Sequence, residues 1–354
     1  MISSTFLQIY PDFMAIATVQ HLLHLRTKKN KQVMQNIARL WDIGRQATSA
    51  QDILDALHPW GTNKNLAFYN TIPRLLMIIG IVVAILGWLI DPYPPFPISF
   101  FVTFLCALFA YIIYESHEPI AEVIDFLEQR MLLLRYDLHF NAMPNSIAAT
   151  SNALLVMSKL KQTFPLFYQG NVSNEITQFA STTWHDGEIE HQVMLFQYHY
   201  VNELVIRGFD SEKQKVKQVH KDQWGAFIFQ MPALGFAASN RQDHFIEPYT
   251  QKWLTSDILV NQKLHIFGCD QQQLARSISP SLTLKLNDFF QQYSGDVVYH
   301  FQENMLCYMG QQNLFGLSKN KHALKDISVL RGHLRTLRLP EYEKFKLSML
   351  NLIS

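Results

Sequence analysis

Histidine and carboxylate side chains are densest between positions 185 and 191. There His185 and His191 flank Asp186, Glu188 and Glu190, a set of nitrogen and oxygen ligands that could hold a divalent metal. On a single continuous strand, the two glutamates would face one side and the two histidines the other. The segment also contains an Asp-Gly pair, which is typical of a hairpin turn with solvated polar neighbours. We therefore predict a solvated turn here and no metal site.

A second polar cluster, at positions 239–244, reads Ser-Asn-Arg-Gln-Asp-His. It contains Ser239, Asp243 and His244, but a catalytic triad is defined by geometry and not by proximity in sequence. We predict an exposed loop between a strand and a helix, and such loops often bind partners. Its candidate partner-binding residues are Asn240, Arg241, Asp243 and His244.

The sequence carries no P-loop, dinucleotide fingerprint or nucleophile elbow. His21 and His24 share a helical face at a spacing that can chelate a metal, but the sequence supplies no third ligand. The 3 cysteines are too few and too scattered for a zinc site or a disulfide framework. We predict a protein with no catalytic site, no cofactor and no metal. The alternative is a membrane-anchored enzyme that uses the 239–244 loop or the 185–191 turn.

Two long apolar segments without charge, Leu75–Ile90 and Pro97–Tyr114, dominate the organisation of the chain. At ~1.5 Å per residue they reach ~24 and ~27 Å, close to the ~30 Å of a bilayer core. A proline-rich turn at 91–96 separates them. We predict a transmembrane hairpin at 67–116, with spans at about 72–90 and 97–114. The alternative is a buried hairpin of a large soluble protein.

The distribution of basic residues predicts the orientation of this hairpin. The turn between the spans has no Lys or Arg, and Arg130 and Arg135 follow the second span. The basic residues before the first span are Arg26, Lys28, Lys29, Lys31, Arg39, Arg45, Lys64 and Arg74. The positive-inside rule therefore predicts that both termini lie in the cytoplasm.

The spans lack the ionisable residues that transporters and proton relays usually need inside the bilayer. Gly80, Ala84 and Gly87 form a small-residue face that can pack against the second helix or against a neighbouring copy. The hairpin is therefore predicted to be an anchor. A homo-oligomer, and with it a subunit of an oligomeric channel, is a further alternative.

Helical patterns lie on both sides of the hairpin. Residues 1–66 are predicted as a cytosolic helical region, with an apolar stripe from Val33 to Trp41. Residues 117–162 are predicted as cytosolic helices whose heptad seam consists of Ile120, Ile124, Leu127, Met131, Leu134 and Leu138. We expect this seam to pack against the stripe at 33–41, and the alternative is a parallel homodimer.

After Phe164-Pro165 the pattern changes to strands, and we predict a cytosolic α+β domain at 163–316. A helix is expected to begin at Pro280. The expected strands are 189–206, Trp224–Phe229, Lys263–Phe267 and the pair formed by Val297–Phe301 and Met305–Met309.

Residues 317–354 are predicted as a helical C-terminal tail. Its apolar stripe consists of Ile327, Leu330, Leu334 and Leu337, beside a basic face with Arg331, Arg335 and Arg338. Such a face can contact an anionic membrane surface, and it can equally be the solvated face of an ordinary helix.

Several motifs resemble those of a bacterial membrane protein family that is known only as a domain of unknown function. They are Trp224-Gly-Ala-Phe-Ile-Phe229, the stretch Asp257–Phe267, the helix start Leu274–Leu282, Asn304–Tyr308 and Asn313–Phe315. The resemblance covers roughly residues 60–316. It implies a two-helix hairpin followed by a cytosolic domain of strands and helices, and it implies no assigned activity. The Phe- and His-rich sheet and the long tail depart from the family pattern.

These observations predict an α+β membrane protein with a two-helix transmembrane hairpin, a cytosolic helical region, and a C-terminal antiparallel-sheet domain with packed helices. We expect a multi-pass protein of the bacterial inner (cytoplasmic) membrane. Its cytosolic domain is expected to bind a protein partner or a lipid head group. A formal net charge of +1 argues against nucleic acid as a partner.

Overall fold

The computed structural model describes residues 27–90, 98–144, 153–207, 214–317 and 325–354. The chain is a mixed helix and antiparallel-sheet protein, as the sequence predicts. It divides into two compact units, Met1–Met131 with Asn320–Thr336, and Leu132–Lys319 with Leu337–Ser354. The helical tail predicted at 317–354 is therefore divided between the units. The helical face predicted to carry His21 and His24 lies outside the described residues, and so does the predicted turn at 91–96.

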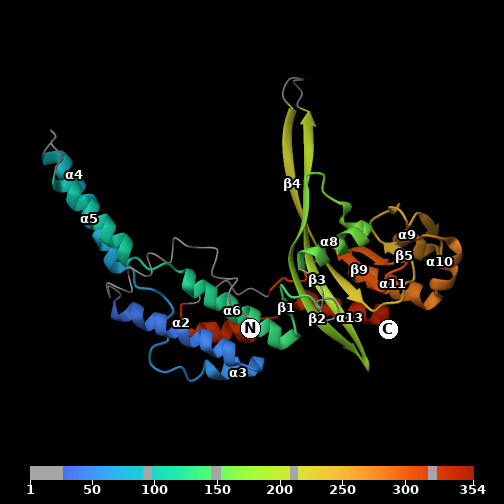
Figure 1. The fold of residues 1–354 in the computed structure, drawn as a ribbon, viewed down its shortest axis with the longest axis horizontal. Helices are drawn as coiled ribbons and strands as arrows, with labels where there is room; N and C mark the ends of the chain where they lie inside the picture. The colour runs from blue at the N-terminus through green and yellow to red at the C-terminus, as the bar shows by residue number, and fades with distance from the viewer. Residues whose placement is uncertain (1–26, 91–97, 145–152, 208–213, 318–324) are drawn as a thin grey trace. The chain divides into compact units, whose positions relative to one another are not determined.

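The described part of the first unit is helical (Figure 1). Its helices are α2 (Lys28–Gln46), α3 (Ala50–Ala56), α4 (Thr71–Ile90), α5 (Ile98–Ile113), the part of α6 (Glu118–Tyr136) up to Met131, and α12 (Ile327–Thr336). Ser49 and Asp52 close a reciprocal capping box at the start of α3. Hydrogen bonds from the hydroxyls of Thr48 and Ser49 lower the pKa of Asp52 to about 2.

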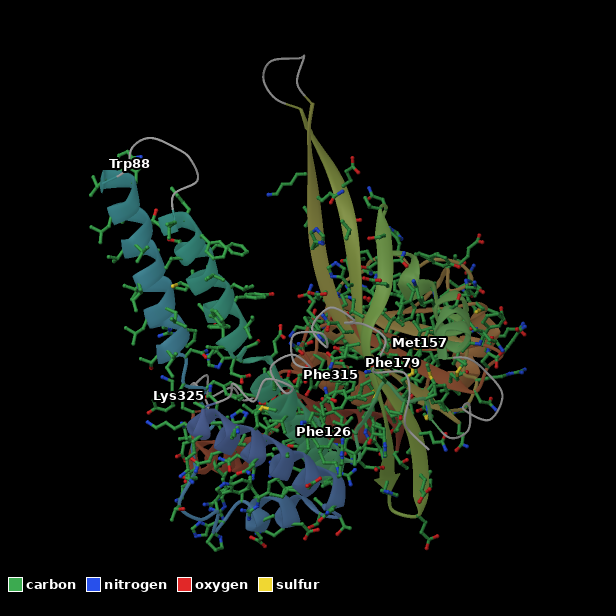
Figure 2. The ribbon with its side chains drawn as sticks, turned by 60° about the vertical axis from the view of Figure 1, so that its left-hand side comes forward. Trp88, Phe126, Met157, Phe179, Phe315 and Lys325 are labelled. Carbon is green, nitrogen blue, oxygen red and sulfur yellow. The ribbon has the colours of Figure 1, made fainter. Side chains whose placement is uncertain are left out.

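The stripe on α2 packs against α6. The ring of Trp41 stacks on Phe126, with ring centroids 4.3 Å apart, and Figure 2 labels Phe126 on α6. A Cβ atom on Gly44 would lie 2.4 Å from the Phe126 ring, so glycine allows the two helices to approach closely. Ile120, Leu127 and Met131 of the heptad seam are buried within the chain. The seam is therefore used for packing within the chain, which is the interpretation that we expect from the sequence in preference to a parallel homodimer.

Buried asparagine side chains fasten the loop between α3 and α4. Asn30 donates to the Tyr69 carbonyl and accepts from the Tyr69 N–H, at 3.3 and 2.8 Å. Asn36 donates to the carbonyls of Asn63 and Asn65 and accepts from the Trp60 indole N–H. Each amide thus satisfies backbone or indole groups that burial would otherwise leave unpaired.

The same loop pairs with the start of α12. The N–H of Leu66 donates to the Lys325 carbonyl at 2.9 Å, and the N–H of Ile327 donates to the Lys64 carbonyl at 2.8 Å. Ile327, Leu330 and Leu334 of α12 are buried, as the apolar stripe predicts. This helix therefore belongs to the core of the first unit and not to a separate tail.

The second unit is built on a nine-stranded antiparallel sheet in the order β1-β2-β3-β4-β9-β8-β5-β7-β6. Figure 1 shows β3 and β4 as long paired strands. The strands are β1 (His139–Phe140), β2 (Ser173–Asp186), β3 (Ile189–Arg207), β4 (Gln214–Phe229), β5 (Phe236–Ser239), β6 (Gln251–Trp253), β7 (His265–Gly268), β8 (Gly295–Tyr299) and β9 (Met305–Gly310).

The predicted strands at 189–206 and 297–309 are confirmed, whereas β2 and the first half of β4 were not expected. Lys263 ends a helix, α9 (Ile258–Lys263), and does not begin a strand. The physical reason is the Asp257 carboxylate, which accepts from the N–H groups of Leu259 and Val260 and caps that helix.

Helices cover both faces of the sheet. One face packs against α8 (Ala153–Thr163) and the short 3-10 helix η1 (Pro165–Tyr168), in a core that includes Phe164, Phe167, Phe196 and Phe227. On the other face, Phe345 of α13 (Pro340–Ile353) contacts the rings of Trp184 and Tyr308. The remaining helices of this unit are α10 (Gln271–Ser277) and α11 (Pro280–Gln292).

Candidate functional sites

The hairpin helices expose their largest apolar side chains. Among the described residues, two helices are long and apolar enough to cross a membrane, and only 11% of the apolar window of each is buried. Trp88, which Figure 2 labels, lies near the C-terminal end of α4 and is 68% exposed. Phe104 on α5 is 62% exposed. A core helix of a soluble protein would bury such residues, so the exposure separates this pair from a buried hairpin.

The small-residue face of α4 packs against α5. A Cβ atom on Gly80 would lie 3.2 Å from the Cβ of Cys106, and one on Gly87 would lie 2.2 Å from the Ser99 hydroxyl. The Thr103 hydroxyl donates to the Gly80 carbonyl at 3.0 Å. Ala84, between the two glycines, is half-buried. This small-residue face therefore packs against α5 of the same chain, which is one of the two packing partners predicted from the sequence.

A buried asparagine also closes the base of the hairpin. Asn70 donates to the Glu115 carbonyl at 2.9 Å and accepts from the Glu115 N–H at 3.2 Å. Beside it lies an apolar hollow of about 690 Å³, with the exposed Arg74 among its lining residues. The hollow is lined otherwise by Pro73, Met77, Ile78, Ala107, Ala110, Tyr111 and Tyr114.

The loop predicted at 239–244 is only partly available to a partner. The Asn240 amide donates to the carbonyls of Phe290 and Tyr293 at 3.2 and 3.1 Å, and so holds the end of α11. Arg241 forms an ion pair with the fully buried Asp296. Asn240 and Arg241 therefore serve the fold, and only Asp243 and His244 are exposed.

Asp296 is the centre of a polar cluster. Its carboxylate accepts from the Ser239 hydroxyl at 2.6 Å and from the Gln242 amide at 3.2 Å, in addition to Arg241. The Ser239 hydroxyl in turn accepts from the N–H groups of Arg241 and Gln242. A buried carboxylate with this many donors is stabilised as a structural group.

The basic face predicted on the tail is also divided. Arg331 donates to the Leu54 carbonyl at 2.8 Å and holds the end of α3. Arg335 and Arg338 are exposed, although only Arg335 lies in α12. His333, which lies between Arg331 and Arg335 in the sequence, contacts the Glu128 carboxylate at 2.7 Å. Arg331 is therefore a packing residue, and Arg335 and Arg338 keep the exposure that a surface contact needs.

The segment at 185–191 is a hairpin turn, as predicted, but the predicted sidedness is wrong. His185 lies opposite Glu190, and Trp184 lies opposite His191. Directly opposed residues of an antiparallel pair share a face, so His185 shares its face with Glu190 and not with His191. His191 is buried, whereas His185 and Glu190 are exposed and 3.5 Å apart. The turn reverses the chain, and a continuous strand cannot represent that reversal.

The described residues offer little for catalysis. No group of three or more His, Cys, Asp or Glu side chains among them could hold a metal ion. Burial raises the pKa of the Cys269 and Cys307 thiols, which disfavours the reactive thiolate.

One polar cluster on the sheet was missed in the sequence. The Nδ1 atom of His199 lies 2.9 Å from the Asp222 carboxylate, and its Nε2 atom lies 3.2 Å from Nδ1 of His220. These residues are 21 and 23 positions apart and meet only through the β3–β4 register. No short-range motif could have found them. One imidazole can donate to the other, with the direction set by the tautomers, on a face where His220 and Asp222 are exposed.

A groove between α8, η1 and β2 was also missed. Its volume is about 620 Å³. Figure 2 labels Met157 and Phe179, which both line the groove. It is lined by Met157, Ser158, Lys161, Gln162, Phe167, Tyr168, Asn174, Glu175, Ile176 and Phe179. The groove combines apolar side chains with the Lys161 ammonium and the Glu175 carboxylate, a mixture that suits recognition of another chain.

No family model, curated protein or solved structure matches this chain, so its resemblance to the bacterial membrane family stays a prediction.

Proposed function

We propose that this chain is an integral membrane protein in which the α4–α5 hairpin spans the bilayer and anchors a cytosolic α+β unit that binds a partner protein. One observation carries the proposal: two helices with long uncharged apolar runs pack on each other through small residues while exposing their large apolar side chains. Exposing the large apolar side chains of both helices to water would be energetically unfavourable, whereas exposing them to lipid is the expected arrangement.

The basic residues before the first span support a cytoplasmic position for both termini in the bacterial inner membrane. Apart from Arg74 in its first turn, α4 contains no Asp, Glu, Lys, Arg or His, and α5 contains none. The small-residue face of α4 packs against α5 of the same chain. These features favour an anchor over a conduit, because a conduit needs polar groups or a helix face that is free to assemble.

Alkaline carbonate extraction of membranes that contain the full chain tests the anchor. We expect the protein to stay with the membrane pellet. A variant with Ile81→Lys and Phe104→Lys should be found in the soluble or aggregated fraction, because each charge in a span costs about 2.5–3.5 kcal/mol. Leu347→Lys is the matched control, since Leu347 is an equally exposed apolar residue of α13. Release of the unaltered chain by carbonate would disprove the anchor.

Fusion of reporters after Ser354 tests the orientation separately. A fluorescent protein that folds only in the cytoplasm should be bright at this position, and alkaline phosphatase should be inactive. The opposite pair of results would reverse the proposed topology while leaving membrane insertion intact.

A further inference from the structure

The outer edge of β2 is paired over only part of its length. The two residues of β1 lie opposite Ala180 and Ser181, and the N–H of Asn141 donates to the Phe179 carbonyl at 3.0 Å. A register shift between Ile176 and Gln178 separates this part from the start of the strand. The first residues of β2 therefore form a sheet edge that β1 does not cover.

The backbone at Ile176 faces this edge. The Lys161 ammonium donates to the Asn174 carbonyl at 2.9 Å, which shows that Asn174 directs its carbonyl away from β3. Alternate residues of an antiparallel strand direct both N–H and C=O to the same edge, so Ile176 directs its pair outward as well. Within the described part of the chain, no backbone or side-chain group bonds to that pair. Unpaired groups of this kind form a template for another strand.

The groove lies along the same edge. An exposed strand edge beside a helix, with a hollow that takes side chains, is the arrangement used for peptide recognition by strand addition. The stretch Ser173–Ile176 contains neither Pro nor Lys, the residues that commonly protect sheet edges from pairing. Met157, Phe167 and Phe179 supply apolar surface to the hollow.

We propose that this groove binds an extended segment of a partner protein, which adds as a strand to β2 at Ile176, places an apolar side chain against Met157 and Phe179, and carries an acidic group beside Lys161. The inference rests on the proposed function as a partner-binding protein and names the chemistry of the partner.

Lys161 supplies the argument for an acidic group. Its ammonium is half-buried and bonds to the carbonyl and the side-chain oxygen of Asn174, both of which are neutral. Burial lowers its pKa, and the nearby charge of Glu175 opposes that effect. Among the described residues, no carboxylate lies within ion-pair distance of Lys161. A carboxylate from a partner would offset the cost of burying this charge.

Selection of a displayed library of short random peptides on the purified full chain in detergent micelles tests the proposal. We expect enriched peptides with alternating apolar residues and an Asp or Glu. Lys161→Glu should weaken the binding of an enriched peptide by about tenfold or more, the effect of losing one favourable charge contact. Lys159→Glu is the matched control, because Lys159 is exposed on the same helix and does not line the groove.

Amide hydrogen exchange then tests the strand pairing itself. The N–H of Ile176 should gain protection when an enriched peptide binds. The unfolding midpoint of each lysine variant, measured alongside, distinguishes a loss of binding from a loss of folding. The proposal is overturned if no peptide is enriched over empty micelles, if both lysine variants bind equally well, or if Ile176 gains no protection. Failure of carbonate extraction would leave these results standing, so the two proposals can fail separately.

Discussion

The hairpin and the sheet unit place the same types of residue in opposite positions. In α4 and α5, Trp88, Phe101 and Phe104 are exposed, and glycines form the contact between the helices. In the sheet unit, Phe196, Phe227 and Trp184 are fully buried. Each arrangement is favourable only in its own solvent, because the hydrophobic effect buries apolar groups from water and has no such role within lipid.

The two units also differ in how buried polar groups are satisfied. In the first unit, asparagine amides bind backbone groups of distant loops, as Asn36 and Asn70 do. In the second unit, a single buried carboxylate, Asp296, organises the cluster around Arg241. Helices joined by loops leave isolated backbone groups that an amide can pair, whereas a sheet pairs most of its own backbone.

The strongest test of this contrast replaces one phenylalanine in each region with alanine. Phe227→Ala should destabilise the sheet unit by about 3–5 kcal/mol, because Phe227 packs against Phe164, Phe167 and Phe196. Phe104→Ala in the hairpin should change stability by less than about 0.5 kcal/mol. Thermal and denaturant unfolding in micelles measures both. Equal losses would show that the hairpin is a packed core after all.

A smaller loss is expected at the buried ion pair. Asp296→Asn should cost about 3 kcal/mol, at the lower end for a broken buried pair, because the Arg241 side chain is 18% exposed and partly solvated. Asp243→Asn is the control, since Asp243 is 79% exposed and contacts only the His265 ring nitrogen. The free energy of unfolding from denaturant titration separates the two. A similar small loss in both variants would mean that Asp296 is not the organising group.

Each asparagine amide of the first unit should contribute less to the free energy of unfolding than the buried Asp296 pair does. Asn70→Ala removes both bonds to Glu115 and should cost about 1–3 kcal/mol. Asn65→Ala, at an exposed asparagine of the same loop whose side chain bonds to Ala67, should cost clearly less. Limited proteolysis of the loop between α3 and α4, together with the thermal midpoint, measures the effect. Unchanged proteolysis in Asn70→Ala would remove the proposed role of this amide.

The smallest expected effect depends on pH and belongs to the sheet unit. The Nδ1 atom of His300 accepts from the N–H groups of Gln302 and Glu303, so the turn between β8 and β9 needs the neutral ring. Burial lowers the pKa of His300, so the unfolded chain binds a proton more readily than the folded one. Stability is therefore complete above the ordinary value of 6.5 and falls as the pH drops through the folded pKa.

His300→Asn provides the comparison for this pH effect, because its amide oxygen can accept the same bonds and does not titrate. Its unfolding midpoint should vary less between pH 7.5 and pH 5.5 than that of the unaltered chain, when both are measured by denaturant titration. Parallel pH profiles would assign the acid sensitivity to other groups.

Local patterns predicted much of the fold. The hairpin helices, the stripe on α2, the Asp-Gly turn after β2 and the β8–β9 pair all follow from residues close in sequence, and all are present. The strand predicted at Lys263–Phe267 begins two residues later, at His265, because the carboxylate of Asp257 caps a helix that continues to Lys263. The tail predicted at 317–354 is helical, but its first helix, α12, belongs to the first unit because residues 64–66 pair with residues 325–327, which are far away in the chain.

The candidate site residues show the same limit. Gly80 and Gly87 were identified from their small size within an apolar run, and they pack as expected. Asn240, Arg241 and Arg331 were chosen as polar residues of exposed segments, yet each bonds to a distant partner in the fold. A polar side chain in a sequence does not reveal whether it faces solvent or a buried backbone group.

The sequence by itself determined the uncharged apolar hairpin, because helix length and composition are local properties. Only the tertiary structure decided which polar residues are structural, how β2 presents an unpaired edge, and where Lys161 meets a groove. These features depend on strand register and on contacts between segments far apart in the chain. The apolar hairpin can therefore be recognised from the residues alone, whereas the surface proposed to bind a partner exists only once the sheet has formed.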